Sequence, residues 1–317
     1  MKDDNLPVRT FKTISQLMHH LHQPAPVHPL IALVNYDDMA LIPFEEEQKI
    51  AVDFYKISFK TCFNGQVKYG QGHYDFEEGG LAFLSPRQMV TTSGDERSYE
   101  GFSLFFHVDF IRNYPLQQTI SQYGFFSYSV SEALFLSAGE KQIISDLFKA
   151  IEAELNNSAD PYSQDVLVSQ IALLLSYSNR FYNRQFITRK VISNEILARL
   201  DDILENYFND GIPLKKGLPG VQHISAQLNV SQRYLSDMLQ SLTGCNTQQY
   251  IHEKLIDKAK EKLSVTLLSI SEIAYELGFE HPQSFNKLFK LKVKLSPSEY
   301  RASFIYKAPF PANGHGT

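Results

Sequence analysis

The sequence lacks the features of a secreted, disulfide-stabilised or membrane-spanning protein. Its 317 residues include only two cysteines, Cys62 and Cys245, too few and too far apart to predict a disulfide framework. No stretch of about 18 apolar residues is present to cross a membrane. The first residues, MKDDNLPVRTFK, lack the apolar run of a signal peptide. We therefore expect a cytoplasmic protein with no membrane contact.

Catalytic motifs are also missing. The sequence contains no recognisable Ser/His/Asp or Cys/His arrangement, and neither cysteine lies in an activating context. Gly70-x-Gly72 lacks the third glycine and the strand-to-helix context of a nucleotide-binding loop. We predict no catalytic residue, no cofactor and no enzymatic activity.

Basic charge is scarce overall but unevenly distributed. The net charge is −5, which by itself argues against nucleic acid as a partner. Residues 190–317, however, hold 15 Lys and Arg against 13 Asp and Glu, whereas the preceding residues hold 15 against 22. A mildly basic end on an acidic body fits a local phosphate-contacting surface, although a solvated helix face gives the same count.

The first part of the chain, to about residue 126, has the pattern of β-strands. Short segments rich in Phe, Tyr, Val and Ile are separated by turns such as Asn64-Gly65, a strong hairpin signal. This spacing predicts an antiparallel sandwich or barrel whose strands lie at 52–63, 67–76, 81–86 and 99–110. We also predict one earlier helix, from Thr13 to His22.

Helical periodicity follows. Residues 139–157 form one amphipathic stripe. Residues Val166–Tyr182 are apolar on more than one face, so this helix needs cover on both sides. The second cover is either the core of the same domain or a second subunit, and we expect a homodimer formed through residues 139–185.

A repeat of about 50 residues occupies the last third of the chain. HISAQLNVSQRYLSDML, from His223, matches EIAYELGFEHPQSFNKLF, from Glu272, at its apolar positions. Each copy predicts a helix, a tight turn at Asn229 or Gly278, and a second helix, because these residue types adopt the left-handed conformation at low cost. Helix starts are predicted at Ser231, at Pro282 and at three capping boxes: Asn246/Gln249, Ser269/Glu272 and Ser296/Glu299.

The helix between the two copies runs from Asn246 to about Leu263. About 18 residues at 1.5 Å rise span roughly 27 Å. Two recognition helices in successive major grooves lie roughly 34 Å apart. A spacer of this length therefore fits two DNA-reading helices in one chain.

The phrases IAYELGF, SFNKLFK and SPSEYR resemble the signature of the AraC/XylS family of bacterial transcription regulators, over roughly Asn194–Phe304. The resemblance implies a seven-helix domain whose third and sixth helices enter successive major grooves of double-stranded DNA, with RNA polymerase as a further candidate partner. We call the recognition helix of each repeat a reader. Carried over by position, the DNA-binding residues of the first reader are Gln232, Arg233, Ser236 and Asp237. Those of the second reader are His281, Gln283, Ser284, Asn286 and Lys287. Lys290 and Lys292 are expected to meet phosphates.

Three residues depart from the family pattern or from its chemistry. Lys294 stands where the family usually has glycine, so it must adopt a left-handed helix end or a different turn. Ser225 replaces a small apolar residue at a helix crossing. Asp237 repels phosphate and can only accept a hydrogen bond from cytosine.

The segment His73–Thr92, HYDFEEGGLAFLSPRQMVTT, resembles the cupin-like sensing domain that precedes this module in many family members. The resemblance implies a jelly-roll barrel that binds a small effector, followed by helices that dimerise. The expected architecture is therefore multidomain α+β: a cupin-like domain at 1–130, a helical dimerisation segment at 131–189, an all-α domain with two helix-turn-helix motifs at 190–304, and a tail at 305–317.

Many cupins are metal enzymes, so a metal site is an alternative. The best ligand candidates are His73, Glu77, Glu78 and His107, but His73 has Asp75 in place of its His-x-His partner. The cluster His19-His20-Leu21-His22 with His28 fits a solvated helix end better. We predict no metal. A constitutive regulator with a purely structural barrel, or a cupin enzyme fused to a DNA-binding domain, stays open as an alternative.

Overall fold

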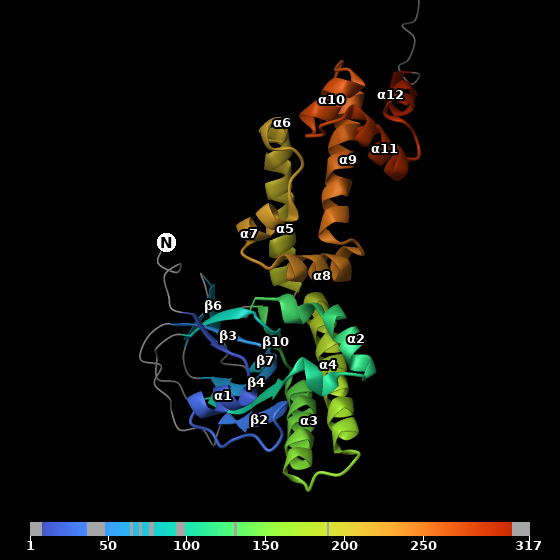
Figure 1. Cartoon of the computed structure of the whole chain (residues 1–317). Helices are drawn as coiled ribbons and strands as arrows, with labels where there is room; N and C mark the ends of the chain where they lie inside the picture. The colour runs from blue at the N-terminus through green and yellow to red at the C-terminus, as the bar shows by residue number, and fades with distance from the viewer. Residues whose placement is uncertain are drawn as a thin grey trace, which may run out of the picture. The chain divides into compact units, whose positions relative to one another are not determined.

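The computed structural model describes residues 8–36, 48–63, 66–69, 72–75, 79–92, 99–129, 132–188 and 190–305 (Figure 1). The chain divides into two compact units. The first unit comprises Met1–Arg189 together with Asn229–Met238, and the second comprises Lys190–Leu228 together with Leu239–Thr317.

The described strands of the first unit form three sheets. A five-stranded sheet has the order β10-β7-β4-β9-β2, a three-stranded sheet the order β1-β3-β8, and β5 pairs with β6. The bounds are β1 Val8–Phe11, β2 Ile31–Asn35, β3 Gln48–Val52, β4 Tyr55–Phe63, β5 Gln66–Tyr69, β6 Gly72–Asp75, β7 Gly80–Leu84, β8 Met89–Thr92, β9 Tyr99–Phe106 and β10 Leu134–Phe135. The expected β-rich region is thus confirmed. The expected closed jelly-roll barrel is not, because the strands described here form separate sheets.

Both faces of the five-stranded sheet are covered. Alternate residues of a strand point to opposite faces. On one face, Phe59 of β4 and Phe102 of β9 stack on Phe148, with ring centroids 5.7 and 5.6 Å apart. Phe148 belongs to α3 (Ala138–Asn156), which packs against α4 (Ser163–Thr188). Two helices therefore cover this face.

The opposite face packs against the three-stranded sheet and α1 (Ile14–His20). The shared core includes Phe11 of β1, Leu17 of α1 and Phe105 of β9, all buried. Ser58 and Ser103 also point to this face and hydrogen bond to each other at 3.1 Å, which satisfies two buried hydroxyls. Because each sheet buries one side against the other, this part of the chain is a layered sandwich.

Two helices of the first unit begin at capping boxes. Thr13 and Gln16 form a capping box at α1, and Ser137 and Glu140 form one at α3. The predicted strand at 99–110 ends earlier, at Phe106, and a 3-10 helix η3 follows (Val108–Ile111). The remaining short elements are α2 Pro115–Thr119, η4 Ile120–Gln122 and η5 Gly124–Ser127. The predicted turn Asn64-Gly65 lies outside the described residues.

The second unit is helical. Its elements are α5 Lys190–Asn209, α6 Pro213–Lys216, α7 Val221–Leu228, α9 Thr247–Val265, α10 Ile270–Glu276, α11 Pro282–Val293 and α12 Pro297–Ile305. Helix α8 (Gln232–Thr243) begins in the first unit and ends in the second. In the described part of the chain, no helix is long and apolar enough to cross a membrane.

Candidate nucleic-acid interface

The first helix-turn-helix consists of α7, a turn at Asn229 and α8. Asn229 has φ +56°, the left-handed conformation that its sequence position predicts. The hydroxyl of Ser231 accepts a hydrogen bond from the backbone N–H of Tyr234 at 3.2 Å, which confirms the predicted cap of α8. Leu235 and Leu239 are fully buried, so α8 is held by the side that carries these two leucines.

The second helix-turn-helix consists of α10, a turn at Gly278 and α11. The Ser269/Glu272 capping box is formed, with both hydrogen bonds between 2.7 and 3.2 Å. Gly278 has φ +90°, and the next backbone N–H, from Phe279, donates to the carbonyl of Ala274 at 3.0 Å. This bond closes α10 in the manner of a Schellman motif. Pro282 is the first residue of α11, as predicted.

A chain of aromatic side chains holds α11 in place. Ring centroids are 5.5 Å apart for Phe279 and Phe285, 5.7 Å for Phe285 and Phe289, and 5.5 Å for Phe289 and Tyr300. Phe285 and Phe289 are fully buried. The orientation of α11 about its own axis is therefore fixed by large apolar contacts, which is what a reading helix requires.

Helix α9 ties the second unit together. It begins at the Asn246/Gln249 capping box and has 19 residues, so it is roughly 28 Å long at 1.5 Å per residue. Lys262 forms an ion pair with Glu276 of α10 at 2.6 Å, and the hydroxyl of Tyr250 donates to Asp201 of α5 at 2.7 Å. Burial and the Asp201 carboxylate raise the pKa of Tyr250, so this phenol stays a neutral donor.

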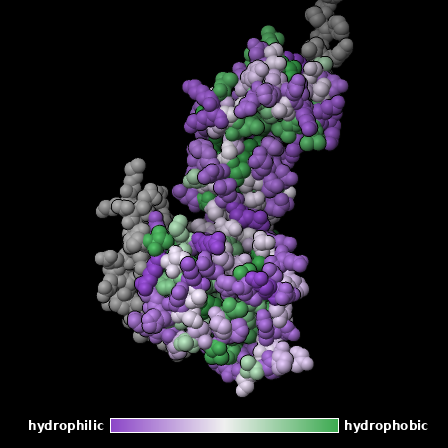
Figure 2. Space-filling view, in the orientation of Figure 1, coloured by the Kyte–Doolittle hydropathy of each residue, from purple (hydrophilic) through white to green (hydrophobic). Residues whose placement is uncertain are grey.

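The side chains of the second reader that are predicted to contact DNA lie outside the core. All seven residues predicted for α11 and its N-cap are exposed: His281, Gln283, Ser284, Asn286, Lys287, Lys290 and Lys292. Positions 283, 286, 287 and 290 repeat with helical spacing and lie on one face, opposite the buried phenylalanines. Lys292 lies 3.7 Å from Glu253 of α9, so part of its charge is offset. The side of the second unit visible in Figure 2 is mostly hydrophilic.

The first reader is placed differently. Gln232 and Arg233 are exposed, but Ser236 and Asp237 are half-buried. The Nε of Arg233 lies 3.0 Å from the Asp237 carboxylate. That carboxylate also accepts a hydrogen bond from the hydroxyl of Tyr128 at 2.8 Å. No local sequence signal points to Tyr128, and the one hint of this contact is that Asp237 suits DNA poorly.

The structure resolves the other departures from the family pattern. Lys294 ends α11 with φ +68° and ψ 3°, so the left-handed helix end is retained despite its side chain. Ser225 is buried, and its hydroxyl donates to the carbonyl of Gln222 at 3.1 Å. A local backbone acceptor thus replaces the water that this hydroxyl loses on burial.

The predicted metal candidates do not form a site in the described chain. His107 uses Nδ1 to accept a hydrogen bond from the N–H of Asp109, and His28 uses Nδ1 to accept one from Leu30. No group of three His, Cys, Asp or Glu with metal-binding geometry occurs among the described residues. The side chains of His73, Glu77 and Glu78 lie outside those residues, so the absence of metal stays a prediction.

Comparisons with known proteins agree with the helix-turn-helix geometry. A family model described as a helix-turn-helix domain matches residues 224–303. YfiF of Bacillus subtilis, an uncharacterized HTH-type transcriptional regulator, is 23% identical over 80% of this chain and 78% of its own length. The lactose operon transcription activator of Staphylococcus xylosus is 26% identical over 51% of this chain and 54% of its own length.

Among solved structures, the C-terminal domain of the response regulator yesN from Fusobacterium nucleatum is 29% identical, with a TM-score of 0.27. It covers 32% of this chain and 96% of its own, and so low a TM-score supports no argument of its own. The family model begins within α7 and extends into α12, so it includes both helix-turn-helix units described above. Residues 224–303 therefore form a helix-turn-helix domain of the type found in AraC/XylS regulators, and the chain is a transcription regulator that binds DNA in a sequence-specific manner.

Proposed function

We propose that this regulator reads two successive major grooves with α8 and α11. The observation that carries the proposal is the polar face of α11. Gln283, Asn286 and Lys287 are exposed there, whereas Phe285 and Phe289 are buried. Amide side chains pair with the edge of adenine and lysine pairs with guanine, so this face presents three groups that discriminate bases.

In α8 the corresponding base-facing residues are Arg233, Ser236 and Asp237, with Gln232 next to the DNA backbone. In the second reader, His281 and Ser284 flank the base-facing residues, and Lys290 and Lys292 contact phosphates. The protein acts on the chromosome in the cytoplasm and has no catalytic activity. RNA polymerase is a candidate partner of the bound regulator.

The test is selection from a pool of duplexes that carry a random central stretch of about 30 base pairs, with the intact chain as bait. We expect enrichment of a defined motif, which is then used as the probe in fluorescence-anisotropy titrations. Retention of duplexes without any preferred sequence by a folded chain would contradict the assigned base-reading residues.

We further propose that the first unit binds a small effector. Support comes from the family resemblance and from a half-enclosed cavity of about 400 Å³ between α1, β2 and the end of α3, a size typical of small-ligand sites. Its lining combines apolar residues such as Met18 and Leu155 with polar ones such as Gln23 and Glu152. The alternative is a constitutive regulator whose first unit only packs.

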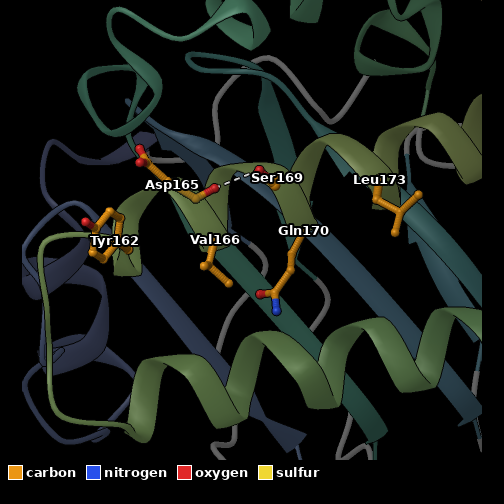
Figure 3. Close-up of a pocket in the computed structure, with 6 residues that line it drawn as sticks. All are labelled: Tyr162, Asp165, Val166, Ser169, Gln170 and Leu173. Carbon is orange, nitrogen blue, oxygen red and sulfur yellow. Dashed lines mark hydrogen bonds between the residues drawn. The ribbon is translucent and has the colours of Figure 1, made fainter.

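Dimerisation is proposed to involve α4. Most of its apolar residues are buried within the chain, but Val166 is 40% and Leu173 is 47% exposed. Figure 3 shows that Val166, Gln170 and Leu173 project from one side of this helix. Together with Tyr162 they line a shallow groove of about 430 Å³. We assign this groove to a second copy of the chain.

Leu173→Glu is expected to shift the chain from dimer to monomer, because the new carboxylate would be buried in the interface at a cost of several kcal/mol. Native mass spectrometry of the full chain measures the fractions of dimer and monomer. The same spectra test the effector proposal, because a copurifying small molecule adds its mass to the wild-type chain. Leu267→Glu is the matched control, since Leu267 is fully exposed and lies in the second unit. A Leu173→Glu chain that dimerises like the control contradicts this assignment.

A further inference from the structure

The N-terminus of α8 is occupied by an acidic side chain from the first unit. Oε1 of Glu132 accepts a hydrogen bond from the backbone N–H of Ser231 at 2.5 Å, and Oε2 accepts one from the Ser231 hydroxyl at 2.6 Å. The N–H of Ser129 also donates to Oε2, at 2.7 Å. Glu132 is only 7% exposed. Burying a carboxylate costs free energy, and hydrogen bonds from several donors are needed to offset that cost.

A DNA phosphate would compete for the same donors. Backbone N–H groups at the start of a helix, together with a capping hydroxyl, are the groups that bind phosphate oxygens. Burial raises the pKa of Glu132, and hydrogen bonds from Ser231 and Ser129 oppose that rise. Among the described residues, the hydrogen-bond partners of the Glu132 carboxylate are Ser231 and Ser129. The Glu132 carboxylate is therefore matched to the N-terminus of α8 rather than to a cation.

A second group of contacts covers the side of α8. The hydroxyl of Tyr128 donates to Asp237 at 2.8 Å, and Nη2 of Arg233 donates to the carbonyl of Gln122 at 3.4 Å. Gly124 approaches both side chains so closely that a Cβ there would lie 2.0 Å from Oδ2 of Asp237 and 2.7 Å from Nε of Arg233. We call Gln122, Gly124, Tyr128 and Glu132 the covering patch.

Aromatic contacts reinforce the arrangement. The ring of Tyr234 meets Tyr128 edge to face at 5.2 Å and Phe186 of α4 at the same distance. Burial and the Asp237 carboxylate raise the pKa of Tyr128, so its hydroxyl remains a neutral donor at physiological pH. These contacts and those of Glu132 all lie inside the first unit.

We propose that the covering patch masks the first DNA reader, and that the chain in this conformation reads DNA through α11 alone. The inference rests on the proposed base-facing role of α8, and it names how that site is regulated. Asp237 cannot contact a base while Tyr128 holds it. Arg233, although half exposed, is turned toward Asp237 and the Gln122 carbonyl rather than toward DNA. A phosphate cannot reach Ser231 while Glu132 occupies its donors.

The poor fit of Asp237 to DNA is consistent with a role in the masked state. An aspartate on a reading helix is repelled by phosphates, but here it accepts hydrogen bonds from Tyr128 and pairs with Arg233. Asp237 therefore serves the masked state. In the unmasked state, Arg233 and Asp237 lose these contacts and face the bases, where the Asp237 carboxylate can accept only from cytosine.

Gly124→Leu tests the proposal in the full chain. The φ of Gly124 lies outside the left-handed region, so leucine fits its backbone, and only the approach of Asp237 and Arg233 is blocked. Gly139→Leu is the matched control, because a Cβ at Gly139 meets no atom within 4 Å. Tyr128→Phe is a milder second variant that removes one hydrogen bond and keeps the ring. Circular dichroism confirms that each chain is folded.

We expect the wild-type chain and Gly139→Leu to select a motif that spans one major groove. Gly124→Leu should select a longer motif with a second block about one helical turn away, and bind it about tenfold more tightly, because apparent affinity scales with the fraction of binding-competent molecules. Tyr128→Phe should gain about threefold. Identical motifs and affinities for all four chains would overturn the masking while leaving sequence-specific binding intact. No motif from any folded chain would overturn the proposed function as well.

Discussion

Gly278→Ala is expected to lower the free energy of unfolding by roughly 2–5 kcal/mol, because a left-handed backbone strain and a steric overlap add together. Gly278 has φ +90°, and a Cβ there would lie 2.8 Å from the carbonyl carbon of Gly217 and 2.9 Å from its oxygen. Both atoms belong to the backbone, so no change of side-chain rotamer can relieve the overlap. Urea unfolding followed by far-UV circular dichroism measures the loss.

Two variants separate the strain from the overlap. Gly244 has φ +77°, but a Cβ there meets nothing within 4 Å, so Gly244→Ala should cost only about 1–2 kcal/mol. Lys294 has φ +68°, so Lys294→Gly should release a similar strain and stabilise the chain by about 1 kcal/mol. Equal losses for Gly278→Ala and Gly244→Ala would show that the approach to Gly217 does not matter.

These turns illustrate what the sequence alone could predict. Asn229 and Gly278 were identified because the choice between helix and left-handed turn depends on the residue itself. The capping boxes Ser269/Glu272 and Asn246/Gln249 were identified because both partners lie within four residues. Such signals are local, so they place the helix-turn-helix units correctly.

The closed barrel was not confirmed because sheet closure depends on pairing between distant segments. β1 pairs in parallel with β3, about 40 residues later, and β10 adds to β7 across more than 50 residues. Periodicity identifies a strand but not its neighbour. A sequence with the right number of short strands therefore fits a barrel and a layered sandwich equally well.

The covering patch was missed for a related reason. Tyr128 and Asp237 are 109 residues apart, and Glu132 and Ser231 are 99 apart. No motif spacing connects them. The one usable signal was chemical, an aspartate in a helix otherwise suited to DNA.

Base recognition and phosphate binding are expected to involve different residues of α11. Gln283 lies in its first turn, where side chains reach base edges, and Gln283→Ala should reduce affinity for the selected duplex by roughly 1–3 kcal/mol with little change on a scrambled duplex. Lys290 lies about two turns later, and Lys290→Ala should weaken both duplexes alike and reduce the slope of log K against log salt by about one. Both side chains are exposed, so neither substitution should affect folding.

Anisotropy titrations of both duplexes at several salt concentrations distinguish the two roles. Gln248→Ala is the matched control, because it removes an exposed amide from the first turn of α9, outside both reading helices. A base-reading amide loses its partner only on the correct sequence, whereas a phosphate-binding ammonium releases one counterion from any sequence. If Gln283→Ala weakens the selected and scrambled duplexes equally, Gln283 contacts the DNA backbone, and the base-facing side of α11 must be assigned to other residues.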